Sequence, residues 1–334
     1  MSTEDSYYGS DKLFTLKDAS DPTRMRSVLE PELGRWVGPG ARLVDLEIDV
    51  LRRRKQRCVL RYALHCEHEG APRHLSFIAK VYKADAGEAV TALMRQLWDH
   101  GFDRHAADHV SIPEVADYMP RLSLLVQEEI GGRPVKDFLA TAEAEWALRR
   151  MAAALAKLHR TPLQPTPAFT MQDHLRRCHP RPQVLHDRCP ELRPAIDEIL
   201  GEARRLETAY AWHQPALIHG DCHMGQVHVD ADHTWVIDFD AACVADPAAD
   251  LGNLLVFLKG KARKIPSAPL LADAFLDEYF KYMPSDILKR VALFEAITHL
   301  RRACKRLRFS EDGWQKKARR FLDESLESLS AARG

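Results

Sequence analysis

His and Asp residues crowd residues 217–253, at spacings that could support either metal chemistry or phosphate chemistry. His219 and His223 are four residues apart, which is the spacing of a helical zinc pair. Gly220 and Gly225 disfavour a helix at this point, and no Glu follows the first His as the zinc-hydrolase motif HExxH requires. The residue types therefore argue against a zinc hydrolase.

Phosphoryl transfer to a hydroxyl would account for the other polar side chains of this stretch. The reaction needs a base for the hydroxyl and oxygen ligands for the Mg²⁺ that accompanies the nucleotide phosphates. Asp221 lies on a predicted loop after an apolar pair, and the amide carbonyl of Gln226 suits a hard cation. A predicted hairpin with strands at 226–229 and 234–237 brings Asp238 to the same end as Asp221 and Gln226. The three side chains could thus form one site.

Five motifs follow one another in this stretch, and their order is more specific than any one of them. They are His219-Gly220-Asp221, Gln226, Ile237-Asp238-Phe239-Asp240, Asp246-Pro247 and Asp250-Leu251. The series resembles the signature of the aminoglycoside phosphotransferase and choline kinase-like family, which has a protein-kinase-like fold. Many members have Asn where Gln226 stands and Gly where Ala245 stands. The HGDxHxGQ form is similar to a maltokinase-like branch of the family.

The resemblance implies roles for individual residues of the stretch. Asp221 would be the catalytic base, and Gln226 and Asp238 would be ligands of Mg²⁺. His219 is interpreted as a residue that orders the loop rather than as a base. Two further carboxylates are interpreted as caps or loop braces, because Asp often hydrogen-bonds nearby backbone: Asp246 and Asp250.

The N-terminal part of the chain contains the elements that the resemblance requires for nucleotide binding. Strands are predicted within 43–51, 57–68 and 74–83, followed by a helix that ends near Gly101. Lys80 lies in the third of these strands and would contact the nucleotide phosphates. An unpartnered Lys in a buried strand would be costly, which favours a partnered role.

The helix that follows the third strand offers one acidic candidate to hold Lys80. This is Glu88, whose alternative role is a favourable charge at a helix N-terminus. A further strand is predicted at 122–130, and its end is interpreted as a hinge. There the main chain of Glu128 and Ile130 would hold the adenine. The turn 52–57 has no glycine, so its cations either contact phosphate or form a solvated basic turn.

These elements predict an α+β, two-lobed protein-kinase-like fold. We expect an N-terminal extension at 1–40, in which Asp21-Pro22 starts a helix, an antiparallel-sheet nucleotide-binding lobe at 41–130, and a mostly helical catalytic and acceptor-binding lobe at 131–334. Asp246 comes only eight positions after Asp238, which leaves no room for a protein kinase's long activation segment. The acceptor is therefore predicted to be a small-molecule hydroxyl.

Composition bounds the class of protein and its compartment. The chain has 334 residues, 46% of them hydrophobic, and a formal net charge of zero, which argues against disorder and against a protein that coats nucleic acid. The number of Cys residues, seven, is odd, and no pair has CxxC spacing, so a reducing cytoplasm is expected. We expect neither a signal peptide nor a membrane span.

The predicted function is Mg²⁺-dependent transfer of the γ-phosphate of ATP or GTP to a small-molecule hydroxyl. The alternative is a kinase-like module that binds nucleotide without transferring phosphate. A third reading, a basic interaction protein, leaves the Asp series unexplained. The C-terminal tail carries a series of cations: Arg301, Arg302, Lys305, Arg306, Arg308, Lys316, Lys317, Arg319 and Arg320. If these residues face the site, they favour a neutral or anionic acceptor such as a sugar. The alternative is that they form a solvated helix face.

Overall fold

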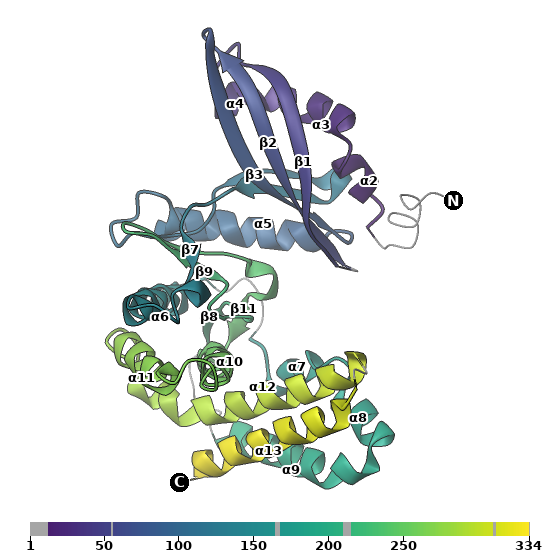
Figure 1. The fold of residues 1–334 in the computed structure, drawn as a ribbon, viewed down its shortest axis with the longest axis vertical. Helices are drawn as coiled ribbons and strands as arrows, with labels where there is room; N and C mark the ends of the chain where they lie inside the picture. Colours follow the sequence, from purple (N-terminus) through teal and green to yellow (C-terminus); the bar gives the residue numbers. More distant parts are fainter. Residues whose placement is uncertain (1–12, 55, 164–167, 210–214, 310–311, 334) are drawn as a thin grey trace. The chain divides into compact units, whose positions relative to one another are not determined.

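Antiparallel strands dominate the first part of the chain and helices dominate the second (Figure 1). The computed structural model describes residues 13–54, 56–163, 168–209, 215–309 and 312–333. These form two units, Met1–Gly131 (unit 1) and Gly132–Gly334 (unit 2). The predicted order of a sheet-rich part before a helical part is confirmed. Lys55 of the basic turn lies outside the described residues.

Unit 1 is built on a five-stranded antiparallel sheet in the order β1-β2-β3-β6-β5. The strands at 43–51, 57–68, 74–83 and 122–130 were predicted, but β5 was not, because its sequence VADYM shows no alternation and all five of its residues are half-buried. The strand bounds are β1 Arg42–Arg54, β2 Arg57–His68, β3 Ala71–Tyr82, β5 Val115–Met119 and β6 Leu124–Glu128; a two-residue strand, β4, spans Val110–Ser111.

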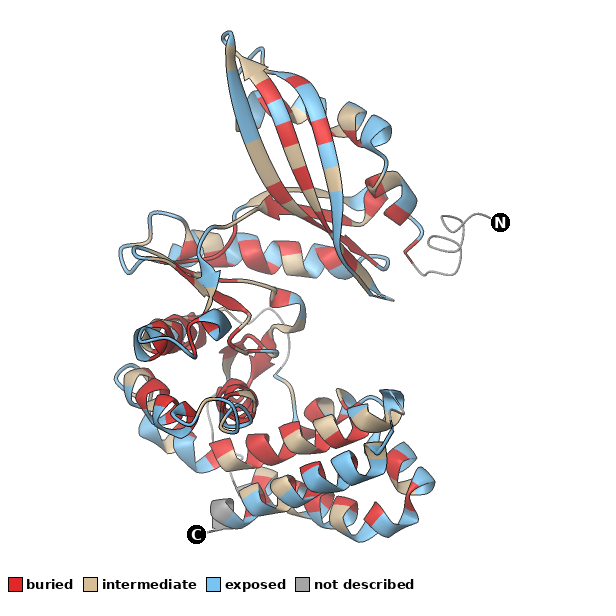
Figure 2. Ribbon diagram, viewed as in Figure 1, coloured by how far each residue is buried: buried red, intermediate tan, exposed pale blue. Residues whose placement is uncertain are grey.

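Three N-terminal helices contribute to the hydrophobic core of this sheet. They are α2 (Leu16–Ala19), α3 (Pro22–Leu29) and α4 (Leu33–Trp36). The predicted start of α3 is confirmed, since the Asp21 carboxylate accepts hydrogen bonds from the backbone of Thr23 and Arg24. Apolar side chains of the three helices join one buried cluster with alternate residues of β2, β3 and β6, and Figure 2 shows this alternation along the strands.

The alternation of β3 separates its side chains onto two faces. Phe77, Ala79 and Val81 belong to the buried cluster, so Lys80 lies on the opposite face of the sheet. Helix α5 (Ala86–Leu97) follows and continues as a short π-helical turn to Phe102, in which Gly101 has a φ of +83°. This ending confirms the predicted helix stop near Gly101.

Unit 2 contains short strand pairs and a set of helices. Strands β9 (Val227–Val229) and β10 (Thr234–Val236) form the predicted hairpin, and β9 also pairs with β7 (Arg133–Pro134). Strand β8 (Ala216–Ile218) pairs with β11 (Cys243–Ala245), a pairing between segments that the sequence did not suggest. The helices are α6 Ala144–Arg160, α7 Met171–Arg176, α8 Pro182–Arg188, α9 Arg193–Ala209, α10 Ala248–Lys259, α11 Ala268–Tyr279, α12 Leu288–Phe309 and α13 Trp314–Arg333.

Two sequence expectations concern the whole chain. All seven cysteines are buried and free. Over the part of the chain that the structure describes, no helix combines the length and apolar character needed to cross a membrane.

Candidate active site

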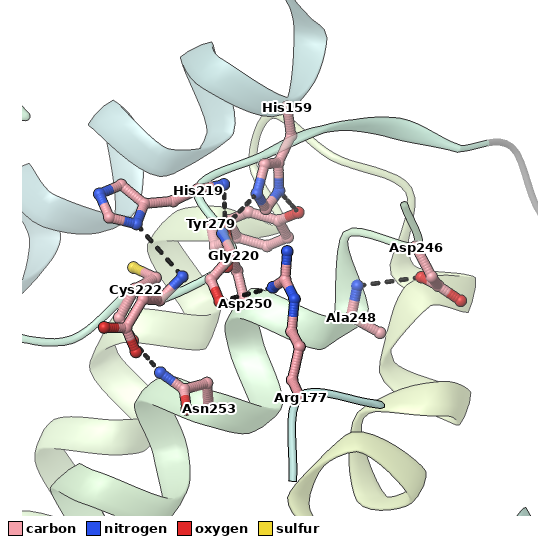
Figure 3. A network of polar contacts seen from close by, with 11 residues as sticks. His159, Arg177, His219, Gly220, Cys222, Asp246, Ala248, Asp250, Asn253 and Tyr279 are labelled. Atoms are coloured by element: carbon pink, nitrogen blue, oxygen red, sulfur yellow. Dashed lines mark hydrogen bonds and ion pairs between the residues drawn. The ribbon is translucent and has the colours of Figure 1, made fainter. Parts of the chain in front are cut away.

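The loop between β8 and β9 carries Asp221. Its backbone is hydrogen-bonded to Asp250, which lies in the first turn of α10 (Figure 3). The backbone N–H of His219 donates to Asp250 Oδ2 at 2.7 Å, and the N–H of Gly220 donates to Oδ1 at 2.8 Å. Both oxygens of one carboxylate are therefore used to fix two consecutive peptides of the loop. The interpretation of Asp250 as a loop brace is confirmed.

Asp250 is 1% exposed, and its charge is balanced by hydrogen bonds. Its Oδ2 lies 3.2 Å from His159 Nε2, and the Nδ1 of the same imidazole lies 2.7 Å from the Tyr279 hydroxyl. Burial alone would raise the pKa of Asp250, but the contacts from His159 and His219 hold that pKa below its usual range. Asp250 is thus a buried carboxylate that remains ionised and stabilises the loop.

The ring of His219 is engaged on both nitrogens. Its Nε2 lies 2.8 Å from the carbonyl oxygen of Ile237, and its Nδ1 lies 3.4 Å from the backbone N–H of Asp221. The carbonyl can only accept a hydrogen bond, so Nε2 carries the hydrogen and donates it, while Nδ1 accepts from the N–H; the ring is therefore the Nε2–H tautomer. This geometry confirms that His219 orders the loop and leaves it no lone pair for a substrate proton.

Gly220 allows the loop to approach the segment before β11. Its φ is +77°, and a Cβ at this position would lie 2.1 Å from the carbonyl oxygen of Ala241, so no other residue fits. Arg177, directly after α7, closes the same contact. Its guanidinium donates to the Gly220 oxygen at 3.0 Å and to the Ala241 oxygen at 2.9 Å.

Asp221 itself is exposed, in contrast to the residues that hold its loop. Within the described residues its carboxylate accepts no hydrogen bond, because the one hydrogen bond of this residue is made by its backbone N–H. The peptide between Cys222 and His223 is fixed by Asn253, whose Nδ2 donates to the Cys222 oxygen at 2.6 Å. A carboxylate with open lone pairs on a braced loop can accept a proton from a bound hydroxyl.

The β9–β10 hairpin brings Gln226 and Asp238 together, as the sequence predicted. Gln226 Nε2 donates to Asp238 Oδ2 at 3.3 Å. Asp238 lies just after the hairpin and has a left-handed backbone, with φ +68° and ψ +57°. This conformation is strained for most residue types, but Asp adopts it more readily than they do. An amide carbonyl and a carboxylate are both hard oxygen donors, and Mg²⁺ is commonly held by one or two such groups together with substrate phosphates. The donor set therefore fits Mg²⁺.

Asp246 braces the chain where α10 begins. Its Oδ1 accepts a hydrogen bond from the Ala248 N–H at 3.0 Å, and its Oδ2 accepts one from Arg290 Nε at 2.6 Å. Asp246 and Arg290 are both buried, so each charge compensates the other. The interpretation of Asp246 as a cap and brace is confirmed.

In unit 1, Lys80 is 5% exposed on β3, while Glu88 is exposed in the first turn of α5. No ion pair joins Glu88 to Lys80 among the described residues, so the expectation that Glu88 holds this lysine is not met. The reason is positional: α5 turns Gly87, Thr91 and Met94 inward, which directs Glu88 toward solvent. The sequence of α5 contains no other carboxylate.

The backbone at the end of β6 has the polarity that a purine requires. Residues 76 and 129 form a hydrogen-bonded pair, since the Glu129 N–H donates to the Ser76 oxygen at 3.2 Å. In an antiparallel ladder the neighbouring residues point the other way, and the Glu128 N–H indeed donates to the Glu114 oxygen at 2.9 Å, so the carbonyl of Glu128 turns away from β3. A continuation of this alternation would turn the Ile130 N–H the same way. A carbonyl acceptor and an N–H donor two residues apart could pair with the edge of a purine.

Several residues of the site were not predicted. Arg177 and Asn253 contact the loop from α7 and α10, 43 and 31 residues away from their partners. His159 lies at the end of α6, 91 residues from Asp250. The one available signal was polarity, because Asn253 and His159 interrupt otherwise apolar helix faces. Such a residue is more often a core group than a functional one, so spacing alone could not identify it.

The sequence matches the model of a family described as the phosphotransferase enzyme family over residues 60–293. Among curated protein sequences, none is significantly similar to the chain.

Solved structures with the same fold include two complexes with a nucleotide and a small molecule. A choline/ethanolamine kinase family protein from Mesorhizobium loti is 18% identical with a TM-score of 0.58, and the match covers 96% of this chain and 98% of that one. Spectinomycin phosphotransferase APH(9)-Ia, solved with ADP and spectinomycin, is 13% identical with a TM-score of 0.57, covering 94% and 98%. APH(2")-IIia, solved with GDP and kanamycin, is 15% identical with a TM-score of 0.57, covering 89% and 97%. The predicted kinase-like fold is thereby confirmed.

Proposed function

Because the chain belongs to the phosphotransferase enzyme family, we propose that it transfers the γ-phosphate of ATP or GTP to a hydroxyl group of a small molecule. The observation that carries the proposal is the state of Asp221. Its carboxylate is exposed and accepts no hydrogen bond within the described residues, while four neighbouring contacts fix the peptides of its loop. This is the arrangement of a preorganised base rather than of a structural carboxylate.

The proposed reaction begins with a hydroxyl that hydrogen-bonds to Asp221. The carboxylate orients the hydroxyl and accepts its proton as the oxygen attacks the γ-phosphorus. The bond between the γ-phosphorus and the bridging oxygen breaks, which leaves ADP or GDP and a phosphate monoester. Gln226 and Asp238 would hold Mg²⁺, which supplies positive charge to the phosphate oxygens.

Unit 1 supplies the proposed donor-binding groups. The buried ammonium of Lys80 would contact the phosphates, and the Glu128 carbonyl with the Ile130 N–H would pair with the purine. One backbone acceptor and one backbone donor do not by themselves select adenine over guanine, so ATP and GTP are both tested as donors. A sugar is among the proposed acceptors, and the maltokinase-like form of the loop supports it.

Substitution of Asp221 tests the proposal directly. We expect Asp221→Asn to lower kcat by about 10²–10⁴-fold, the usual contribution of a general base, with nucleotide affinity unchanged. The measurement is acceptor-dependent release of ADP or GDP. Asp232→Asn is the matched control, because Asp232 is an exposed carboxylate in the turn of the β9–β10 hairpin.

Two outcomes would contradict the proposal. Full turnover by Asp221→Asn would remove this residue from the reaction. Tight nucleotide binding without transfer to any hydroxyl compound would favour the alternative, a kinase-like module that only binds nucleotide. The exposed position of Glu88 and the absence of glycine from turn 52–57 give that alternative its support.

A further inference from the structure

Helix α12 presents two cations beside the loop that carries Asp221. Arg301 and Lys305 are four residues apart and therefore lie one turn apart on the same face of the helix. The Arg301 guanidinium donates from Nη2 to the side-chain oxygen of Asn253, whose Nδ2 holds the Cys222 carbonyl at 2.6 Å. A single side chain thus links Arg301 to the carbonyl of Cys222, the residue that follows Asp221.

Both cations have unused binding capacity. Arginine offers five N–H donors, and the contact with Asn253 is the one hydrogen bond that Arg301 makes within the described residues. Lys305 is exposed and forms no ion pair in the same part of the chain; its ammonium lies 5.8 Å from the ring of Phe309. Two other arginines that approach the loop or α10 each hold more than one protein oxygen: Arg177 donates to the Gly220 and Ala241 carbonyls, and Arg290 donates to both oxygens of Asp246.

The electrostatic surroundings of Asp221 agree with this geometry. Burial lowers the pKa of Arg301, and the carboxylate of Asp221 opposes that shift. The pKa of Lys305 is lowered by partial burial and by the positive charge of Arg306. The carboxylate of Asp221 again opposes this shift. Lys136 lies near the same loop, since its Cδ is 3.8 Å from the Cβ position of Gly225. Cations of α12 therefore border the loop that carries Asp221.

A polycationic acceptor is poorly suited to this border. Like charges repel, and each ammonium group brought near Arg301 or Lys305 would add to the repulsion. An anionic group would instead form ion pairs with both cations. A guanidinium can donate hydrogen bonds to two oxygens of one carboxylate or phosphate at once.

We propose that the acceptor carries an anionic group, a carboxylate or a phosphate ester, close to the hydroxyl that receives the phosphate, and that Arg301 and Lys305 bind it. This inference rests on the proposed function, because it places the acceptor beside Asp221. The two residues determine specificity and do not take part in proton transfer.

The test compares acceptors that differ in charge on the same carbon skeleton. One set is glucose, glucuronate, glucose 6-phosphate and glucosamine; the other is glycerol, glycerate, glycerol 3-phosphate and 3-amino-1,2-propanediol. Binding is measured by thermal melting with Mg²⁺ and a non-hydrolysable ATP analogue, so that it does not depend on turnover. Transfer to the same compounds is measured separately.

Two variants and one control make the test specific. Lys305→Gln removes a charge that forms no ion pair within the described residues, and Arg301→Gln also releases Asn253. Lys289→Gln is the control, since Lys289 is an exposed lysine on the same helix, about 24 Å away at 1.5 Å per residue. We expect each variant to raise the Kd or KM of anionic compounds by about tenfold or more, whereas Lys289→Gln leaves both this affinity and the turnover of a neutral acceptor unchanged.

The outcomes separate the inference from the proposed function. Preferential binding of an anionic compound that both variants weaken supports the inference, even if no phosphate is transferred and the proposed function fails. Transfer to glucosamine or the amino diol at undiminished rates in both variants supports the function and overturns the inference. The inference is also overturned if the anionic compounds raise the melting temperature no more than the neutral and amino compounds of the same set, or not at all.

Discussion

At the residue scale, Asp250 determines the geometry of the loop that carries Asp221. Its two oxygens accept the N–H groups of His219 and Gly220 and contact His159, all inside the protein. In Asp250→Asn one oxygen becomes an NH₂ group that cannot accept from a backbone N–H. We expect the free energy of unfolding to fall by about 3–5 kcal/mol, the usual cost of breaking a buried charge pair.

Urea unfolding of Asp250→Asn, followed by circular dichroism, measures this change. Asp197→Asn is the control, because Asp197 forms an exposed ion pair with Arg193 on α9 and such pairs contribute little. Equal midpoints for the two variants would show that Asp250 does not brace the loop.

His174 makes stability depend on pH. It is 9% exposed, its Nε2 has no hydrogen-bond partner among the described residues, and burial with the charges of Arg177 and Arg301 lowers its pKa to about 4. The unfolded chain binds a proton on this ring near pH 6.5 and the folded protein does so only near pH 4. Between these values the unfolded state holds more protons, so stability falls as the pH falls from about 6.5 to about 4.

Substitution of His174 isolates that contribution. The ring packs between Phe169 and Phe294, so phenylalanine fits the site. We expect His174→Phe to flatten the pH dependence of the urea midpoint between pH 6.5 and 4 by up to about 1.4 kcal/mol per pH unit. His105→Gln, at an exposed histidine, is the comparison. An unchanged slope in His174→Phe would mean that this ring is protonated in the folded protein.

Residue types and local order predicted the acidic members of the site but not their partners. Asp246 and Asp250 were interpreted as braces because Asp commonly bonds backbone, and both act so. Arg177 and Asn253 reach the loop only through the packing of α7 and α10, which no local spacing records. Glu88 shows the converse error, since adjacency in sequence suggested a partner that the rotation of α5 directs to solvent.

At the element scale, the close approach of α10 and α12 positions both Asn253 and Arg301. A Cβ on Gly252 would lie 2.7 Å from the Glu295 nitrogen, the Phe294 carbonyl carbon and the Phe294 Cβ. Two of these atoms belong to the backbone and cannot move without the helix. Gly252→Ala would therefore separate the helices and displace Asn253, which holds the Cys222 peptide.

We expect Gly252→Ala to lower the melting temperature and kcat together, although alanine has the higher helix propensity. Gly201→Ala is the matched control, because that glycine also lies within a helix and a Cβ there meets nothing within 4 Å. The control should gain about 0.5–1 kcal/mol of stability. Stabilisation of both variants by the same amount would show that the helix contact yields easily.

Prediction of the elements succeeded where the sequence pattern itself defines the fold. The alternation in β2 and β3 and the polar turn between β9 and β10 are local signals, and these strands form as expected. Strand β5 has five half-buried residues and no alternation, and β8 and β11 have three residues each. Such short strands exist because a partner lies beside them, so their own residues carry little information.

At the scale of the whole molecule, the fold depends on helices that lie outside the residues matched by the family model. The family match spans 60–293, yet helices outside it complete both units. Leu16, Met25 and Leu29 of the N-terminal helices are buried in the core of unit 1, and the hydroxyl of Ser325 on α13 donates to the Ala296 oxygen on α12. The predicted extension at 1–40 therefore contributes core residues from its described part.

The last prediction concerns both units, since the donor-binding groups are assigned to each of them. A ligand that binds only the folded protein stabilises it by about 2.7 kcal/mol at about a hundredfold excess over its Kd. We expect ATP or GTP to raise the melting temperature in the presence of Mg²⁺, and Asp238→Ala in unit 2 to lose the part of the shift that needs Mg²⁺. Lys80→Ala in unit 1 should weaken the shift at every Mg²⁺ concentration, because its ammonium acts on phosphate directly.

Asp273→Ala, at an exposed carboxylate on α11, is the control. A Mg²⁺-dependent shift that survives in Asp238→Ala would remove this residue from the metal site, and a shift independent of Mg²⁺ in the unaltered protein would remove the metal from donor binding.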